Sequence, residues 1–228
     1  MIPKRIHYCW FGKNEKSENI KEMIKTWELY CPEYEIIEWN ENNFSIEETN
    51  QYVKDAYKNK KWAFVSDYVR LYVLYNYGGI YLDTDVELLK NFDNFLENNM
   101  FMCVESQNTL CTAVIGSEKN NEILKKALNE YKNLEFIIDG KMNLRPNSEF
   151  LYELISNEKK IKIKDNIIYK LDNITIYSSD FFSAKNIHTH KLTKTSNTVS
   201  IHHLDASWYS KRRKFLRKIK KIILKIFH

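Results

Sequence analysis

The chain has 228 residues, of which 43% are hydrophobic and 14% aromatic, so one domain can bury a sizeable core. Its net charge of +5 arises at one end, because nine of the 35 lysines and arginines follow position 210, while the other 26 face 30 acidic residues. Proteins that bind nucleic acid normally carry a basic folded face with readable motifs, so nucleic acid is excluded as an expected partner.

The first 40 residues predict a strand, a helix and a second strand. Residues 4–10 and 34–39 alternate in polarity as strands do, and residues 17–30 have apolar side chains at helical spacing, with Ser17 as the expected N-cap. This order implies a parallel sheet with right-handed crossovers. Ligands of such sheets bind beyond the carboxyl ends of the strands.

Residues 62–77 predict a helix buried within the domain, preceded by a polar helical segment over 47–61. At about 100° per residue, Ser66, Asp67 and Arg70 share one arc, so the buried helix carries a single polar island. Because a buried charge needs a partner, we expect Asp67 and Arg70 to act as a pair.

Gly78 and Gly79 are expected to end this helix, since glycine accepts the left-handed conformation. Residues 80–86 then read as a strand, on which Asp83 and Asp85 point to the same face. Two carboxylates so placed can hold Mg²⁺ or Mn²⁺. The alternative for an isolated Asp-x-Asp is a solvated loop, which the flanking buried helix and strand disfavour.

The second half predicts strands at 100–105 and 110–115, a helix at 122–131, a helix near 148–155, and short strands near 167 and at 174–177. A last strand, 199–203, contains His202, whose ring nitrogen Mn²⁺ tolerates better than Mg²⁺ does. His203 and Asp205 are less favoured ligands, and a hydrogen-bonded structural histidine is the alternative.

Four segments carry a family resemblance: IPKRIHYCWFG at 2–12, AFVSDYVR at 63–70, LYNYGGIYLDTD at 74–85 and HHLDASW at 202–208. Together they resemble glycosyltransferase family 32, which includes yeast outer-chain mannosyltransferases, bacterial capsular-polysaccharide transferases and clostridial glucosylating toxin domains. The likeness covers the first 95 residues and the region near His202. Cys111 departs from it where relatives usually carry Asn, and so does Arg145, which precedes Pro146 in place of Gly.

The resemblance implies an α/β nucleotide-sugar transferase fold of the GT-A type, with a mainly parallel central sheet, over residues 1–208. It implies retaining transfer of a hexose from a nucleotide diphosphate sugar, with a UDP-sugar expected, to a surface polysaccharide or other glycan. Mn²⁺, or Mg²⁺, is the expected ion. The expected ligands are Asp83, Asp85 and His202, and the expected catalytic residues are Asp67, Arg70, Asp83 and Asp85.

Five residues are expected to contact the donor: His7, Trp10, Tyr81, Ser207 and Trp208. For His7 and Trp10 the alternative is a packing role in the core. No residue is an obvious nucleophile, so front-face and double-displacement chemistry both stay open.

Residues 209–228 predict a basic amphipathic helix that lies on an anionic membrane surface, with a helix packed on the domain as the alternative. The N-terminus lacks the apolar core of a signal peptide, so we expect a cytoplasmic protein, peripheral on the inner face of the plasma membrane. The four cysteines lie at spacings unlike those of zinc modules and are expected to be buried structural thiols.

Two other functions remain in competition. A catalytically silent module that binds sugar nucleotides or glycans could keep the same fold, although both carboxylates and the late histidine are retained. A protein whose function is membrane attachment through residues 209–228 would leave the Asp-x-Asp motif unexplained.

Overall fold

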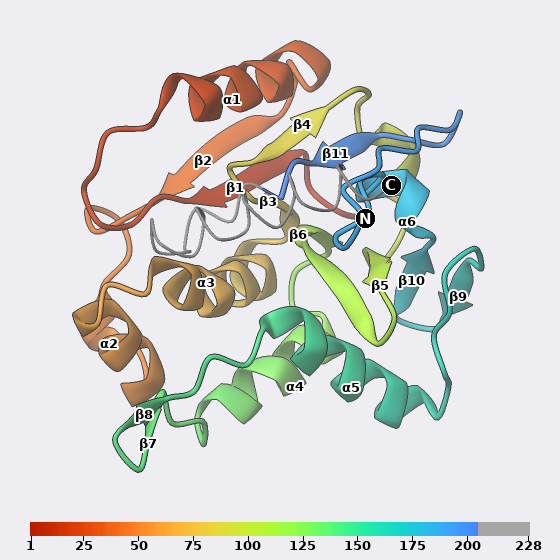
Figure 1. Ribbon diagram of the computed structural model, residues 1–228. Helices are drawn as coiled ribbons and strands as arrows, with labels where there is room; N and C mark the ends of the chain where they lie inside the picture. The colour runs from red at the N-terminus through yellow and green to blue at the C-terminus, as the bar shows by residue number, and fades with distance from the viewer. Residues whose placement is uncertain (205–228) are drawn as a thin grey trace, which may run out of the picture.

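A seven-stranded sheet in the order β2-β1-β3-β6-β5-β10-β9 crosses the computed structural model, which describes residues 1–204 (Figure 1). Strands β2, β1, β3, β5 and β10 run in one direction, and β6 and β9 run against them. The mainly parallel α/β sheet is therefore confirmed, with two inverted strands. The strands are β1 Arg5–Cys9, β2 Glu35–Trp39, β3 Gly79–Leu82, β5 Met100–Ser106, β6 Thr109–Ser117, β9 Tyr169–Leu171 and β10 Ile174–Tyr177.

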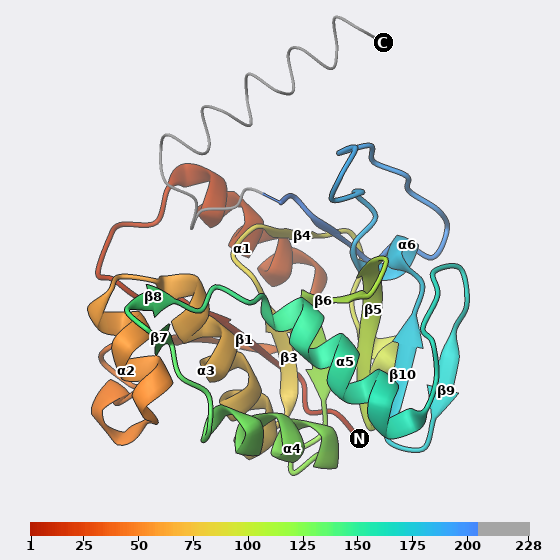
Figure 2. The same ribbon diagram turned by 60° about the horizontal axis from the view of Figure 1, so that its bottom comes forward.

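Helices cover both faces of the sheet (Figures 1 and 2). One face carries α2 Gln51–Lys58, α3 Trp62–Tyr77, α4 Glu122–Tyr131 and α5 Asn147–Lys159, and the other carries α1 Glu18–Tyr30 and α6 Ser179–Phe182. Short 3-10 turns lie at Ile46–Glu48 and Asp93–Phe95. Along β5, Met100 and Met102 pack into the core under α3 and α4, whereas Phe101 and Cys103 pack into the opposite core. Both faces are buried, as expected for a layered α/β sheet.

Helix α3 ends in a glycine pair that lets the chain enter β3 without a loop. Gly78 and Gly79 have φ values of 64° and 114°, in the region that side chains rarely adopt. A Cβ on Gly79 would also lie 2.8 Å from the backbone oxygen of Arg5 and 2.9 Å from Nε2 of His7. Only glycine therefore allows β3 to lie against β1 directly after the helix.

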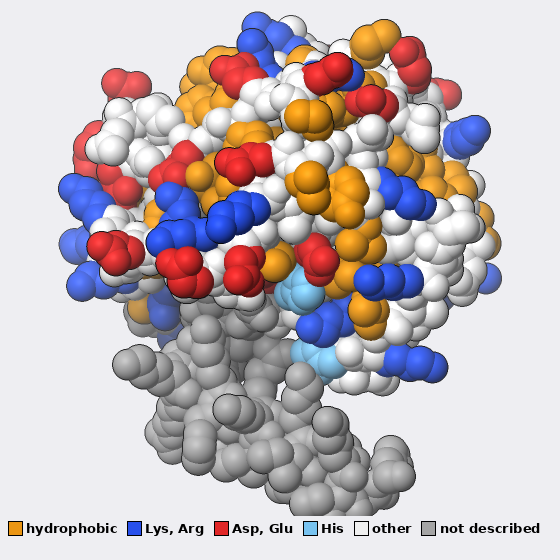
Figure 3. Space-filling model, turned by 90° about the horizontal axis from the view of Figure 1, so that it is seen from above, with side chains coloured by type: hydrophobic (Ala, Val, Ile, Leu, Met, Phe, Trp, Pro, Cys, Tyr) orange, Lys and Arg blue, Asp and Glu red, His pale blue; other side chains and the backbone are white. Residues whose placement is uncertain are grey.

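Two smaller sheets complete the fold. Strand β4 Val86–Leu88 pairs antiparallel with β11 Ser200–His202, and β7 Ile137–Ile138 pairs with β8 Lys141–Met142. The predicted strand at 199–203 is confirmed by β11. Within residues 1–204, no helix is long and apolar enough to cross a bilayer. On the face seen in Figure 3, acidic and basic side chains are interspersed with hydrophobic ones.

Candidate active site

Asp83 and Asp85 lie in the turn that follows β3, at the carboxyl edge of the sheet. The amide of Asp83 makes the last bond to β6, to the carbonyl of Ala113 at 2.9 Å, and the amide of Val86 then donates to the carbonyl of Asp83 at 3.0 Å. The predicted strand over 80–86 is therefore wrong at positions 83–85, because the backbone turns out of the sheet there before β4 begins at Val86. The two carboxylates still converge, but a turn brings them together instead of strand alternation.

His202 joins the two carboxylates through the β4–β11 ladder. It lies opposite Val86, and the next amide, that of His203, donates to the carbonyl of Asp85 at 2.9 Å. Its Nε2 atom is 3.5 Å from Oδ1 of Asp85. One ligand atom each from Asp83, Asp85 and His202 lies within 4.8 Å of the others, so the predicted ligand residues meet in space.

The arrangement of these three side chains fits a divalent cation. An octahedral ion with bonds of about 2.1 Å places neighbouring ligands about 3 Å apart and opposite ligands about 4.2 Å apart. The three side chains are 27%, 18% and 14% exposed for Asp83, Asp85 and His202, so one side of the group faces solvent. The residues can hold an ion and leave positions open for a substrate's oxygens.

The surroundings of His202 favour its protonated form. Burial lowers the pKa of the imidazole, but Asp85, Cys111 and Glu105 outweigh burial and raise this pKa well above its usual value. A cation that binds Nε2 must therefore displace a proton. Cation affinity is expected to fall as the pH falls.

Arg70 connects helix α3 to this turn. Its Nη2 atom lies 3.0 Å from Oδ1 of Asp67 and 3.2 Å from Oδ1 of Asp83. Its Nη1 atom donates to the carbonyl of Thr112 at 2.6 Å and to Oδ2 of Asp83 at 3.4 Å, and Nε donates to the carbonyl of Ser66 at 3.3 Å. The predicted Asp67–Arg70 pair is present, and Asp83 belongs to the same network.

Arg70 and Asp67 are both buried within this network. The Arg70 side chain is 5% exposed and its three nitrogens contact protein oxygens, so Arg70 supports Asp83, and its expected catalytic role stays a prediction. Burial works against the guanidinium charge, but Asp83, Tyr81 and Asp67 keep the pKa of Arg70 well above its ordinary value. Burial raises the pKa of Asp67 to about 6, although Arg70 lowers it. Asp67 is paired with Arg70, and its expected catalytic role stays a prediction.

Tyr81 is a second support for Asp83. Its side chain is fully buried, its hydroxyl donates to Oδ1 of Asp83 at 2.9 Å, and the guanidinium of Arg70 lies 4.6 Å from its ring centroid. The predicted contact between Tyr81 and the donor stays a prediction, since the ring lies in the core while the hydroxyl reaches the DXD turn. Asp83 is thus held by two residues from beneath, with its outer side free for a ligand.

Comparison with known proteins identifies the region that carries this geometry. Residues 17–102 match the family described as the glycosyltransferase sugar-binding region containing the DXD motif. The motif is Asp83-Thr84-Asp85. This part of the chain is therefore similar to the DXD family of sugar transferases. The family resemblance expected from the sequence is therefore confirmed.

Proteins similar to this chain include a yeast and a bacterial protein. The chain is 28% identical over 142 residues to mannosyl phosphorylinositol ceramide synthase SUR1 of Saccharomyces cerevisiae, covering 59% of this chain and 36% of that one. It is 25% identical over 186 residues to subversion of eukaryotic traffic protein A of Legionella pneumophila, covering 68% and 28%. The chain therefore spans about a third of the length of the curated relatives it matches.

Solved structures confirm the fold class of the chain. The PaToxG glycosyltransferase superposes with a TM-score of 0.54 at 23% identity over 69% of each chain. A glycosyltransferase involved in glycosylation of the major capsid of PBCV-1 gives 0.50 at 11% identity, covering 93% of this chain and 98% of that one. The GT-A-type fold expected from the resemblance is confirmed.

His7 is a core residue and not a donor contact. Its side chain is fully buried, Nδ1 accepts from Nε1 of Trp39 at 3.1 Å, and Nε2 lies 2.8 Å from the carbonyl of Gly78. Because indole can only donate, Nε2 must carry the proton and donate to Gly78. Both nitrogens are satisfied by the protein, so the predicted cofactor-binding role of His7 is wrong.

The remaining predicted donor contacts lie at the site edge or outside the described residues. Trp10 follows β1 at the carboxyl edge of the sheet, where its Nε1 donates to the carbonyl of Asn14 at 2.6 Å, and its contact with a donor stays a prediction. Ser207, Trp208 and the alternative ligand Asp205 lie outside residues 1–204. His203, the other alternative, instead binds Oε2 of Glu87 at 2.8 Å.

Glu105 is the site residue that sequence reasoning missed. It lies near the end of β5, and its Oε1 atom is 3.6 Å from Nδ1 of His202. The parallel direction of β3 and β5, separated by the inverted β6, places this end at the same sheet edge as Asp83. A glutamate at the end of a predicted central strand was the available signal.

Proposed function

We propose that the protein transfers a hexose, with retention of anomeric configuration, from a nucleotide diphosphate sugar to a glycan acceptor. The observation that carries the proposal is the meeting of Asp83, Asp85 and His202 at the carboxyl edge of the sheet, within 4.8 Å of one another. A UDP-sugar is the proposed donor. The names of relatives support the hexose, since two of them are named as mannosyl transferases or synthases of inositol phosphoceramide.

Mn²⁺, with Mg²⁺ as the other choice, is the proposed ion, because a nitrogen ligand suits Mn²⁺ better. Asp83, Asp85 and His202 would hold it, and it would supply positive charge that stabilises a departing nucleoside diphosphate. The protein's own contribution is rigidity. Arg70 and Tyr81 fix Asp83 from below, so the carboxylate needs little reorganisation when the donor binds.

The acceptor is proposed to be a glycan carried on a lipid at the membrane surface. The relatives named for inositol phosphoceramide support a lipid-borne acceptor. The basic residues that follow position 210 support attachment to anionic lipid on the inner face of the plasma membrane. Peripheral attachment would place the donor site beside the acceptor.

Hydrolysis of a panel of UDP- and GDP-sugars tests the donor and the ion together. The full chain should turn over one UDP-sugar, lose that turnover in a chelator, and regain it best on addition of Mn²⁺. Turnover that persists in excess chelator would remove the proposed role of the ion. Binding of a sugar nucleotide without any turnover or transfer would favour the silent binding module instead.

A further inference from the structure

The two ring nitrogens of His202 face two different groups of side chains. Nε2 faces the DXD turn, 3.5 Å from Asp85, whereas Nδ1 faces the opposite way, 3.6 Å from Oε1 of Glu105. The sulfur of Cys111, one oxygen of Glu105 and one nitrogen of His202 lie within 4.8 Å of one another. The far side of the imidazole therefore meets a thiol and a carboxylate that the proposed transfer does not use.

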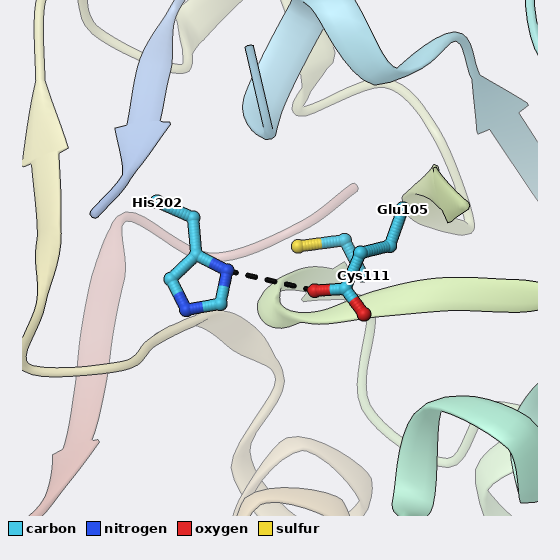
Figure 4. Close-up of side chains that lie close together, drawn as sticks. All are labelled: Glu105, Cys111 and His202. Atoms are coloured by element: carbon cyan, nitrogen blue, oxygen red, sulfur yellow. Dashed lines mark ion pairs between the residues drawn. The ribbon is translucent and has the colours of Figure 1, made fainter. Parts of the chain in front are cut away.

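Three strands build this second group. Glu105 lies near the end of β5 and Cys111 near the start of β6, so one hairpin presents both, and His202 arrives from β11. Figure 4 shows the sulfur of Cys111 and the carboxylate of Glu105 pointing toward the imidazole. Cys111 is fully buried and the Glu105 side chain is 9% exposed, so water has little access. Nδ1 of His202 is buried and has no hydrogen-bond partner.

The three ligand types together select a class of ion. A thiolate, an imidazole nitrogen and a carboxylate oxygen are the ligands of Zn²⁺, at about 2.3, 2.0 and 2.0 to 2.2 Å. A tetrahedron with such bonds separates its ligand atoms by roughly 3.3 to 3.6 Å. The observed 3.6 Å between Nδ1 of His202 and Oε1 of Glu105 matches that edge.

We propose that Glu105, Cys111 and Nδ1 of His202 form a second cation site, for Zn²⁺, which adjoins the DXD site and shares His202 with it. Three protein ligands leave the fourth position of the tetrahedron for water or another small ligand. The site does not depend on a cysteine spacing motif, because Cys111 is its one thiol and the hairpin and β11 supply the other ligands.

The second site has a consequence for the first. A neutral imidazole binds one ion through one nitrogen and carries its proton on the other. With Zn²⁺ at Nδ1 of His202, Nε2 would keep the proton and could only donate toward Asp85. Occupancy of the thiolate site would therefore withdraw one ligand from the DXD site.

Cobalt substitution tests the thiolate ligand directly. Co²⁺ added to the full chain in reducing buffer should give thiolate-to-cobalt charge-transfer absorption, which Zn²⁺ should compete away. Cys111→Ser should abolish the absorption and weaken Zn²⁺ binding, measured by calorimetry, at least about tenfold. Cys103→Ala is the matched control, because it removes the thiol of the cross-strand neighbour of Cys111 but no ligand. Glu105→Gln should also weaken Zn²⁺ binding.

Asp83→Asn separates this site from the proposed transferase site. It should keep the charge-transfer absorption even where it disables sugar transfer, so failure of one proposal does not decide the other. Circular dichroism establishes whether each variant is folded. If Cys111→Ser does not fold, the Zn²⁺ affinity of Glu105→Gln tests the site instead. Absent thiolate absorption in the folded wild type, absorption that survives in Cys111→Ser, or absorption that requires Asp83 would each overturn the second site.

Discussion

The guanidinium of Arg70 lies 3.2 Å from Asp83, so a residue of helix α3 holds one carboxylate of the DXD turn. The charge of Asp83 is thereby shared with Arg70 before any cation binds. Asp85 lies 3.5 Å from Nε2 of His202, which comes from β11. The two carboxylates of the motif therefore have different neighbours, a buried guanidinium and an imidazole.

Asp85→Asn is expected to keep the fold and lower donor turnover by roughly 10²-fold or more, because it removes charge that holds the cation at the leaving group. Steady-state hydrolysis of the active sugar nucleotide at saturating Mn²⁺ measures this. Asp139→Asn removes a carboxylate from the exposed turn between β7 and β8 and should be neutral. Equal rates for Asp85→Asn and wild type would contradict the role of Asp85.

Asp67 and Arg70 should behave as one unit in a double-mutant cycle of unfolding free energies. Arg70→Met leaves the buried Asp67 without its ion-pair partner, and Asp67→Ala leaves Arg70 with Asp83 as its remaining carboxylate. The two substitutions should therefore couple by about 0.5 to 3 kcal/mol. The control cycle uses Lys4 and Glu33, an ion pair of 2.7 Å whose side chains are 38% and 74% exposed. A coupling no larger than that of this exposed pair would mean that the buried pair is not a unit.

Tyr81→Phe should loosen Asp83 while the core stays packed. The lost hydroxyl bond of 2.9 Å is expected to cost about 1 kcal/mol of stability and to weaken cation binding roughly tenfold. Tyr34→Phe is a matched control, since its hydroxyl donates to Asp93 at 2.8 Å and lies outside the site. Calorimetric titration measures the Mn²⁺ affinity of both variants. A similar loss of affinity in the two would argue against a specific role for Tyr81.

Local sequence patterns predicted the helices and strands that position the site, because the residues that start and end each element lie within or next to it. The bounds of helix α3, 62–77, follow from its apolar face and the glycine pair after it, and Ser17 caps α1 as expected. The turn at Asp83 was not predicted. It begins where the backbone hydrogen bonds between β3 and β6 end, and the local sequence does not mark that position. Propensity alone does not fix that point.

Local sequence patterns predicted contacts within one element but not contacts between segments that lie far apart in the sequence. Asp67 and Arg70 are three residues apart on one helix, so their pairing follows from periodicity. The bond from Arg70 to Asp83 crosses from helix to turn, and no local pattern encodes it. His7 was misassigned for the same reason, because its partners Trp39 and Gly78 lie 32 and 71 residues away.

His7 should make stability depend on pH. Burial lowers the pKa of His7 from 6.5 in the folded state, although the bond to Gly78 raises it. Below pH 6.5 the unfolded chain binds a proton that the folded protein does not, so the stabilisation is present above 6.5 and is lost as the pH falls toward the lower folded pKa. The slope for one proton is at most about 1.4 kcal/mol per pH unit.

Urea unfolding at several pH values checks this dependence. His7→Asn should be less stable at neutral pH, and its unfolding free energy should fall less steeply below pH 6.5 than that of wild type. His188→Asn, at an exposed position, should keep the wild-type slope. A slope for His7→Asn equal to that of wild type would assign the acid sensitivity to other groups.

Deletion of residues 211–228 should release the protein from anionic vesicles. The deleted residues carry nine of the 35 basic side chains, and each contributes roughly 1 kcal/mol near an anionic surface. Apolar side chains at seven positions add to this attraction if the segment forms the predicted helix. Binding of the full chain should also weaken as added salt screens it.

The same truncation should leave hydrolysis of a soluble sugar nucleotide nearly unchanged, because the proposed donor site ends at Trp208. Transfer to a lipid-borne acceptor in vesicles should fall instead, since the enzyme no longer concentrates at the surface. Co-sedimentation with anionic and neutral vesicles, run beside both assays, separates these effects. If the truncated protein still sedimented with anionic vesicles, or the full chain bound neutral ones equally well, residues 211–228 would have to be reassigned to packing against the domain.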